Sequence, residues 1–412
     1  MEVSVRTTYF PGGKVNEKAI EHAGLRIALV GTRGVPAHYG GFETCVEEVG
    51  RRLAERGHSV TVYCRSGNGM DTRAKEYQGM RLVHLPALRR RSLETLSHTG
   101  LSVAHLLFRR ADATIVFNAA NAPWLPFLRL AGLPVATHMD GLEWKRAKWG
   151  ALGKRYYRWA EGFAVRFSNA LIADAAGIRD YYRSTFDAAT ELISYGAPLL
   201  PAREPERLAN VGLSAGQYHL VVARLEPENH VHMIVEGYVR SSAKLPLVVV
   251  GTTPYGQEYS QQVQDSADSR VRFLGGVWDQ DLLDELYANA LIYWHGHSVG
   301  GTNPSLLRAI GAGTATNAFD VNFNHEVLGS AGKYFRDAGE VARLVEDSEA
   351  HPAASSSRGS QARELAAKYD WDLVADRYEA LCYGLESGAL THPQSSRDTS
   401  GTRMQDESRV AS

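Results

Sequence analysis

The chain has 412 residues, of which 44% are hydrophobic and 22% charged, and its formal net charge is −1. A globular soluble chain of this length exceeds one typical core, so we expect two domains. The near-neutral charge gives no bulk attraction for a polyanion, which argues against nucleic acid as a partner. The three cysteines form no Cys-x-x-Cys pair, which argues against a disulfide scaffold and a structural zinc site.

The two ends of the chain differ in composition from the rest. Residues 1–24 carry charges throughout and are typical of a flexible extension rather than a signal peptide. Residues 386–412 are rich in Ser, Thr, Gly, Arg and Asp, which predicts a disordered tail. No apolar run approaches the roughly 20 residues that span a bilayer. Because the scattered cysteines suit a reducing cytosol, we expect a cytoplasmic protein.

Residues 25–196 alternate between strand and helix patterns. Between the first two strands, apolar residues recur at helical spacing from Phe42 to Leu53, which makes a βαβ unit and implies a parallel sheet. The pattern breaks at Tyr195–Pro198, a plausible hinge. Short apolar runs predict buried strands at Arg26–Val30, Ser59–Cys64, Arg81–Leu85, Ala113–Phe117, Val135–His138 and Ala170–Ala173.

Residues 197–365 repeat this alternation, and residues 366–385 end the chain's ordered part with an amphipathic helix. Two βα domains of similar size would face each other across a cleft, and ligands in such folds bind beyond the carboxyl ends of the strands. The predicted strands of the second domain are Leu220–Ala223, Leu247–Val250, Val271–Leu274, Leu291–Trp294 and Ala315–Ala318.

The loop from Val299 to Gly313 is the most informative segment. Gly300, Gly301, Thr302 and Asn303 precede a short apolar run, and Pro304 suits a first helical position. The unpaired N–H groups and the dipole of such a helix start favour an anion such as a phosphate.

A second glycine-rich loop, Gly31–Glu43, follows the first strand. It is neither Gly-x-Gly-x-x-Gly nor a Walker loop, and no acidic residue ends the second strand, so a nicotinamide site is disfavoured. With Gly40 and Gly41 it could form a nest of backbone donors for a diphosphate or a sugar. The alternative is an ordinary tight strand–helix turn.

Two further strand ends carry candidate groups. Arg224 could make a charged fork to phosphate oxygens, or form a surface salt bridge with Glu226 or Glu228. His138 and Asp140, with Glu143 nearby, could orient an acceptor hydroxyl and take its proton. A structural histidine is the alternative for His138.

Two other segments remain open to both functional and structural interpretations. From Trp144 to Trp159, six basic residues interleave with aromatic ones, and Arg89–Arg91 form a second basic run. This suits an anionic membrane surface or a pyrophosphate-linked lipid, or a solvated helix whose aromatic residues face the core. After the last strand, Asn322, Asn324 and Glu326 could contact a sugar, or form an Asx turn and helix cap.

Taken together, these segments resemble the retaining family 4 glycosyltransferases, which have the GT-B fold. The bacterial DUF1972-type, rhamnosyltransferase-like subgroup is the most similar. The resemblance runs from about Arg26 to about Leu385, and it is carried by the strings Val30–Pro36, Tyr39–Thr44, Asp140–Arg146, Ala223–Asn229, His297–Gly313 and Phe319–Asn324.

The resemblance implies an α/β protein with two Rossmann-like domains facing a central cleft and a C-terminal helix that crosses back to the first domain. The second domain would hold a nucleotide-diphosphate sugar and the first an acceptor. His138 and Asp140 would lie near the reacting sugar carbon, and neither a metal nor another cofactor would be needed. The donor would contact Gly40, Gly41, Arg224, Asn229, Gly301, Thr302, Asn303 and Arg308.

The implied activity is a metal-independent, retaining hexosyl transfer in cell-surface polysaccharide biosynthesis. The sugar would be rhamnose and the acceptor a lipid-linked saccharide or an oligosaccharide. The segment Glu143, Trp144, Lys145 and Arg146 would contact the acceptor or the inner face of the plasma membrane. Two rivals stay open: a nucleotide-sugar epimerase on the same fold, and a weakened sugar-nucleotide-binding protein.

The sequence departs from the family pattern at three positions. Asn229 stands where a second phosphate-binding lysine is usual, and Gly300 and Arg308 stand at the two glutamate positions of the donor loop. The second glutamate normally accepts hydrogen bonds from ribose hydroxyls, and a guanidinium cannot accept any. Arg308 could instead reach a phosphate and supply the charge missing at Asn229.

Overall fold

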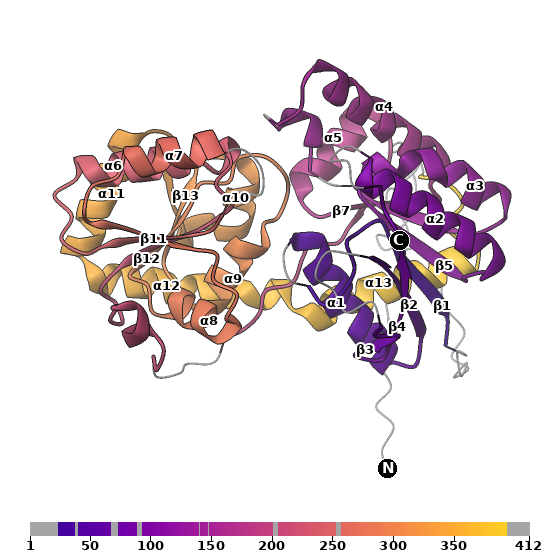
Figure 1. Cartoon of the computed structure of the whole chain (residues 1–412), viewed down its shortest axis with the longest axis horizontal. Coiled ribbons are helices and arrows are strands. Elements are labelled where there is room, and N and C mark those ends of the chain that lie inside the picture. The colour runs from indigo at the N-terminus through magenta and orange to yellow at the C-terminus, as the bar shows by residue number, and fades with distance from the viewer. Residues whose placement is uncertain are drawn as a thin grey trace, which may run out of the picture.

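The chain forms two α/β domains joined side by side, as Figure 1 shows for the computed structural model. Residues 1–23 and 394–412, which contain most of the expected extension and tail, lie outside the described residues, as do Asp140 and Arg89–Arg91. The structure describes residues 24–37, 40–66, 73–88, 93–139, 141–146, 148–200, 205–252 and 257–393.

The first domain is built on one sheet of strand order β3-β4-β2-β1-β5-β6-β7-β8. All six predicted strands are present, and they pair in parallel. Two edge strands escaped prediction because each is only two residues long: β3 (Glu76–Tyr77), which is antiparallel to β4, and β8 (Glu191–Leu192). The predicted strands are β1 (Arg26–Val30), β2 (Ser59–Arg65), β4 (Met80–Leu85), β5 (Ala113–Phe117), β6 (Val135–His138) and β7 (Ala170–Ala173).

Helices cover both faces of this sheet because its strands are apolar on both sides. Ile27 and Leu29 of β1 pack into one hydrophobic cluster, while Ala28 and Val30 pack into another. The first cluster includes α1 (Gly41–Glu55) and α13 (Trp371–Glu386). The second includes α2 (Glu94–Phe108), α3 (Leu125–Leu130), α4 (Ala151–Phe167) and α5 (Ala176–Phe186).

The second domain has a parallel sheet of order β11-β10-β9-β12-β13-β14, the doubly wound arrangement of nucleotide-binding domains. Each of the five predicted strands lies within one residue of its predicted bounds; β14 was missed. The strands are β9 (His219–Val222), β10 (Leu247–Val250), β11 (Val271–Gly275), β12 (Ile292–His295), β13 (Thr316–Phe319) and β14 (Lys333–Phe335). Its helices are α6 (Val231–Arg240), α7 (Gln257–Asp265), α8 (Gln280–Ala288), α9 (Pro304–Ala312), α10 (Asn322–Leu328), α11 (Ala338–Ala350) and α12 (Pro352–Ala366).

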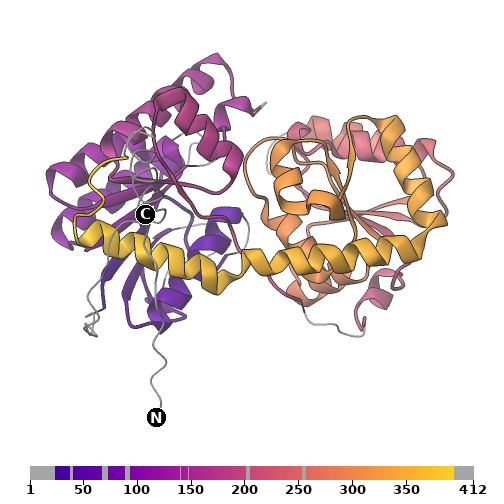
Figure 2. The ribbon, with the colours of Figure 1, turned by 180° about the vertical axis from the view of Figure 1, so that it is seen from behind.

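The chain crosses between the domains twice, and the two crossings touch. The backbone N–H of Ala197 donates to the Tyr369 carbonyl at 2.6 Å, and Gly196 leaves room for the Trp371 ring. From there α13 runs back along α1, as Figure 2 shows from behind. The expected helix returning to the first domain is therefore present.

An ion-pair cluster fixes α13 to the first domain. The ring of His58 accepts the Leu25 N–H at Nδ1, so its Nε2 carries the proton and donates to Glu379 at 2.8 Å. Arg56 contacts the same carboxylate at 2.8 Å. The hydrogen bond from His58, assisted by Arg56, holds the pKa of Glu379 below its ordinary value.

Glu379→Gln should destabilise the protein by about 1 to 2 kcal/mol at pH 7. Because the pKa of Glu379 is lowered on folding, its ionised form stabilises the fold above about pH 4.5, and this contribution disappears as the pH falls through the folded pKa. Urea unfolding at several pH values measures the difference. Glu386→Gln, an exposed position on the same helix, is the control. A loss that is the same at every pH contradicts the prediction.

Candidate active site

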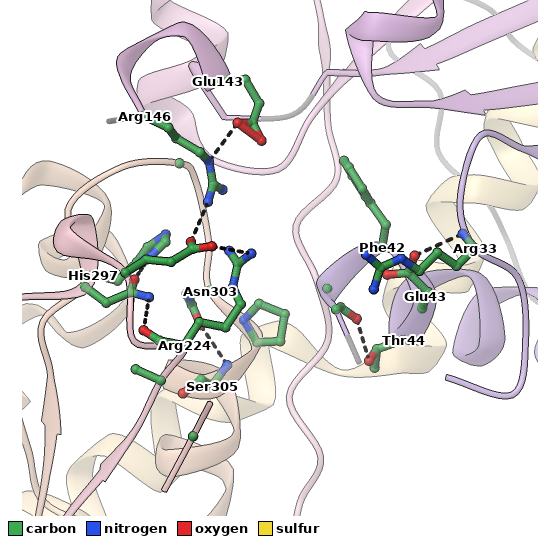
Figure 3. Close-up of a pocket in the computed structure, with 18 of the residues that line it drawn as sticks. Arg33, Phe42, Glu43, Thr44, Glu143, Arg146, Arg224, His297, Asn303 and Ser305 are labelled. Atoms are coloured by element: carbon green, nitrogen blue, oxygen red, sulfur yellow. Dashed lines mark hydrogen bonds and ion pairs between the residues drawn. The ribbon is translucent and has the colours of Figure 1, made fainter. Parts of the chain in front are cut away.

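A cavity of about 910 Å³ lies between the two domains. Its walls come from loops that follow strands of both sheets at their carboxyl ends, where parallel sheets place their ligands. Figure 3 shows residues of the second domain, among them Arg224 and Asn303, opposite Phe42 and Thr44 of the first. The two domains therefore share one site.

On the second-domain side, the N-terminus of α9 borders the cavity. The side chain of Asn303 caps this helix by accepting the Ser305 N–H at 2.9 Å. The Ser305 hydroxyl contacts Tyr287 and Tyr293, which are buried beneath it, and donates to the Val222 carbonyl. These bonds hold the helix start rigidly against the end of β9, so its positive dipole end faces the cavity.

The loop before α9 contacts the first domain through Gly301 and Thr302. The Thr302 hydroxyl donates to the Asp174 carbonyl at 2.7 Å, across the interface. A Cβ atom on Gly301 would lie 2.0 Å from a carboxylate oxygen of Asp174. Both predicted residues line the cavity, but the Thr302 side chain joins the two domains.

Arg224 and Asn229, which follow β9, both line the cavity. The Arg224 guanidinium lies 3.4 Å from Glu226, so the cavity position and the salt bridge foreseen as alternatives coexist. Asn229 is buried; its amide donates to the Arg224 carbonyl and contacts the His297 ring, both at 2.8 Å. Both polar atoms of the Asn229 side chain therefore bond within the second domain.

Gly40 and Gly41 lie across the cavity from α9. Gly40 has φ 118°, a backbone conformation that favours glycine. A Cβ on Gly41 would lie 3.1 Å from the ring of Pro304. The carboxylate of Glu43 accepts the Arg33 N–H at 3.0 Å and ties the preceding glycine loop to α1. The glycine pair and the α9 N-terminus thus approach each other closely.

His138 lies behind the cavity wall rather than on it. Its ring is fully buried, stacks on Phe117 and Tyr195, and meets the edge of Phe42. Within the described residues neither ring nitrogen has a well-formed hydrogen bond. Burial lowers its pKa to about 4, which keeps the imidazole neutral. Its neighbour Asp140 lies outside the described residues.

The segment from Glu143 to Arg146 divides between two environments. Glu143 and Arg146 are 7% and 8% exposed, line the cavity and pair at 2.9 Å. Arg146 also reaches Glu228 of the second domain at 3.7 Å. Trp144 and Lys145 are absent from the cavity wall; the guanidinium of Arg158 lies 4.3 Å above the Trp144 ring. Of the segment expected to contact the acceptor or the membrane, only Glu143 and Arg146 therefore line the cavity.

Arg308 does not lie on the cavity wall. Its guanidinium pairs with Asp284 of α8 at 2.6 Å. In this arrangement it supplies no charge near Asn229. Of the candidates after β13, Asn324 is buried and bonds the His297 carbonyl, while Glu326 accepts the Ala176 N–H of the first domain at 3.0 Å.

Sequence reasoning missed several cavity residues. Arg33, Arg65 and Lys148 of the first domain line it, as do His295 and Trp278 of the second. Arg65 and His295 end strands, so the rule that ligands lie at carboxyl strand ends could have found them. Arg65 is buried, and desolvation lowers its pKa although Glu94 lies 3.4 Å away. No local sequence pattern marked Trp278 as a residue of the site.

This architecture, two doubly wound domains with a cleft between their carboxyl strand ends and a returning helix, defines the GT-B fold. Residues 40–196 match the family described as Glycosyl transferase 4-like domain. No curated protein sequence matches the chain.

Solved structures of known proteins share the whole fold. Sucrose-phosphate synthase from Thermosynechococcus elongatus is 19% identical, with a TM-score of 0.77 over 88% of this chain and 99% of that one. HepE from Anabaena, solved with UDP and glucose, is 15% identical, with a TM-score of 0.72 over 88% and 100%. A trehalose-phosphate synthase from Burkholderia xenovorans, solved with glucose-6-phosphate, is 12% identical, with a TM-score of 0.68 over 87% and 100%. At these identities the similarity establishes the fold alone.

His138→Phe should remove part of the pH dependence of stability. The pKa of His138 is lowered on folding to about 4, so the unfolded chain binds a proton below about pH 6.5 that the folded chain does not. The wild type should therefore lose roughly 2 kcal/mol more than the variant between pH 7 and pH 5. Denaturant unfolding at both pH values tests this, and parallel losses in the two proteins would contradict it.

Asn229→Ala should cost about 1 to 3 kcal/mol of stability, because it leaves the Arg224 carbonyl and the His297 ring without their buried partner. Asn289→Ala, which removes one half-buried bond to the Glu285 carbonyl, is the matched control and should cost less. Equal losses of stability in thermal unfolding of the two variants would contradict the prediction that the buried bonds of Asn229 contribute more than the bond of Asn289.

Proposed function

We propose that this protein is a glycosyltransferase that takes its sugar from a nucleotide-diphosphate donor. One observation carries the proposal: the N-terminus of α9 and the guanidinium of Arg224 meet in the cavity between the domains. A helix start and an arginine together favour a diphosphate. The family match of residues 40–196 and the neighbour solved with UDP-glucose support it.

The two walls of the cavity suggest a division of labour. On the second domain, the loops after β10 and β11 bring Thr252, Val277 and Trp278 to the wall, which suits a base and its ribose. On the first domain, Arg33 and Arg65 line the same cavity as the aromatic residues Tyr156 and Tyr157 of α4. These cations and rings suit a saccharide acceptor that carries an acidic or lipid-linked group.

The proposed reaction is a transfer with retained configuration. The bond between the anomeric carbon and the donor phosphate oxygen breaks, and the acceptor oxygen bonds to the same carbon on the same face. The acceptor proton passes to an oxygen of the departing diphosphate. Arg224 and the α9 N–H groups would stabilise the charge that develops there. Metal independence belongs to this proposal.

The finer assignment rests on the sequence resemblance. The DUF1972-type subgroup points to rhamnose from its thymidine diphosphate, to a lipid-linked saccharide acceptor in cell-surface polysaccharide synthesis, and to the inner face of the plasma membrane. Among the described helices, none combines the length and apolar character that crossing a bilayer requires.

A weakened sugar-nucleotide-binding protein is the second candidate, because Arg308 stands at the usual glutamate and pairs with Asp284. Donor screening distinguishes the candidates. Wild type and Arg308→Glu are incubated with thymidine, uridine and guanosine diphosphate sugars, with and without saccharide acceptors. Transfer by the wild type supports the proposal. Donor binding without transfer in both proteins supports the second candidate, and epimerised donor without acceptor overturns both.

Arg224→Ala should weaken binding of the nucleoside diphosphate by roughly 10- to 100-fold, because it removes a charge-assisted contact of about 1.5 to 3 kcal/mol. Calorimetric titration of the purified protein with thymidine and uridine diphosphates measures this. Arg336→Ala, which removes an arginine 74% exposed far along the second sheet, is the control. Unchanged affinity in Arg224→Ala would remove the observation that carries the proposed function.

A further inference from the structure

Exposed hydrophobic side chains gather on one layer of the first domain. Helices α2, α3 and α4 touch one another in sequence and cover the sheet face opposite α13 (Figure 1). Of twelve large exposed hydrophobic residues in the described chain, eight belong to this layer or cap α2. They are Leu93, Leu101, Leu107, Phe108, Phe127, Leu130, Leu152 and Trp159.

The outermost of these residues are almost fully exposed. Phe108, Leu130 and Leu152, one from each helix, are 86%, 87% and 85% exposed. On α4, an apolar stripe continues inward from Leu152 through Tyr156 and Trp159, at spacings of four and three that share one helix face. The Trp159 ring, 49% exposed, stacks on Phe163 at 4.7 Å. Packing therefore supports the stripe from within, while Leu152 at its outer end is 85% exposed.

The charges on this layer have one sign. The only acidic residues of the three helices are Glu94 and Glu161. Glu94 pairs with Arg65 at the cavity, and Glu161 is 3% exposed and accepts the Tyr181 hydroxyl. The exposed charged residues of the three helices are all basic: Arg129, Lys154, Arg155, Arg158 and Arg166. Apolar tips among basic side chains are the pattern of proteins that lie on anionic bilayers.

The same helices lead into the cavity. The N-terminus of α2 supplies Leu96 to its wall, and the first turns of α4 supply Gly153, Tyr156 and Tyr157. A bilayer that contacts the N-terminal ends of α2 and α4 would therefore lie next to the first-domain wall of the cavity.

We propose that the outer face of α2, α3 and α4 docks on an anionic lipid bilayer, with Leu130, Leu152 and Trp159 in the headgroup region and Arg155, on the same face of α4 as Leu152, on lipid phosphates. The docking itself stands on the exposed residues. Its purpose rests on the proposed function: a lipid-linked acceptor would reach the cavity from the adjoining bilayer.

Sedimentation with lipid vesicles tests the docking. The full chain is mixed with vesicles of phosphatidylcholine alone or with about one-third phosphatidylglycerol. Binding is expected only to the anionic vesicles, and it should weaken as salt rises. Arg155→Glu should lower binding by more than roughly fivefold, since one basic residue at such a surface contributes about that factor. Leu152→Ser should also weaken binding.

Matched controls come from the exposed side of the chain's last helices. Leu373→Ser, a residue 49% exposed on α13, and Lys368→Glu should bind vesicles like the wild type. The proposal is overturned if the wild type does not bind, if the control variants lose as much as the layer variants, or if light scattering shows that the layer variants abolish a dimer instead.

Diphosphate titration of the same proteins keeps this inference apart from the proposed function. Loss of vesicle binding with normal diphosphate affinity in the layer variants supports the docking. A wild type that binds diphosphate but no vesicles overturns the docking alone. Vesicle binding without any diphosphate binding leaves the docking standing and removes the proposed function.

Discussion

Close backbone contact between glycine loops of the two domains is the constraint on which the site depends. A Cβ on Gly141 would lie 2.1 Å from Gly300, and one on Gly301 would collide with Asp174. Only residues without side chains let the α9 N-terminus come this near to the first domain. Since a helix dipole acts over about one turn, that approach decides whether both domains act on one ligand.

The returning helix α13 fixes the position of the two domains relative to each other. Two chain crossings touch at Ala197 and Tyr369, and α13 is fixed to α1 by the cluster around Glu379. Polar contacts join the domains beside the cavity: Thr302 to Asp174, Glu326 to Ala176 and Arg146 to Glu228. Such an interface can open and re-form while the packed helix remains in place. The geometry thus separates a permanent joint from a site that a ligand could enter.

The sequence predicted the strands well because buried parallel strands read as short, continuous apolar runs. It failed at β3, β8 and β14, where two or three residues leave no period to detect. At the site, the sequence predicted the glycine-rich loops at the strand ends, but it did not predict the direction in which the side chains point. Thr302 was expected to contact the donor; it lines the cavity, but its hydroxyl joins the domains. His138 was expected either near the acceptor or as a structural histidine, and it lies among Phe42, Phe117 and Tyr195. Such outcomes depend on tertiary partners that local patterns do not encode.

Arg308 shows how far a single departure can mislead. From the sequence it appeared able to replace the charge missing at Asn229. In the fold, Asp284 neutralises it at 2.6 Å, while Asn229 secures the loop of Arg224. Among the described second-domain residues of the cavity wall, Arg224 is then the only arginine, and Glu226 is its present partner. An anion that binds there would have to replace or share the Glu226 carboxylate at that guanidinium, so the helix start of α9 has to act together with Arg224.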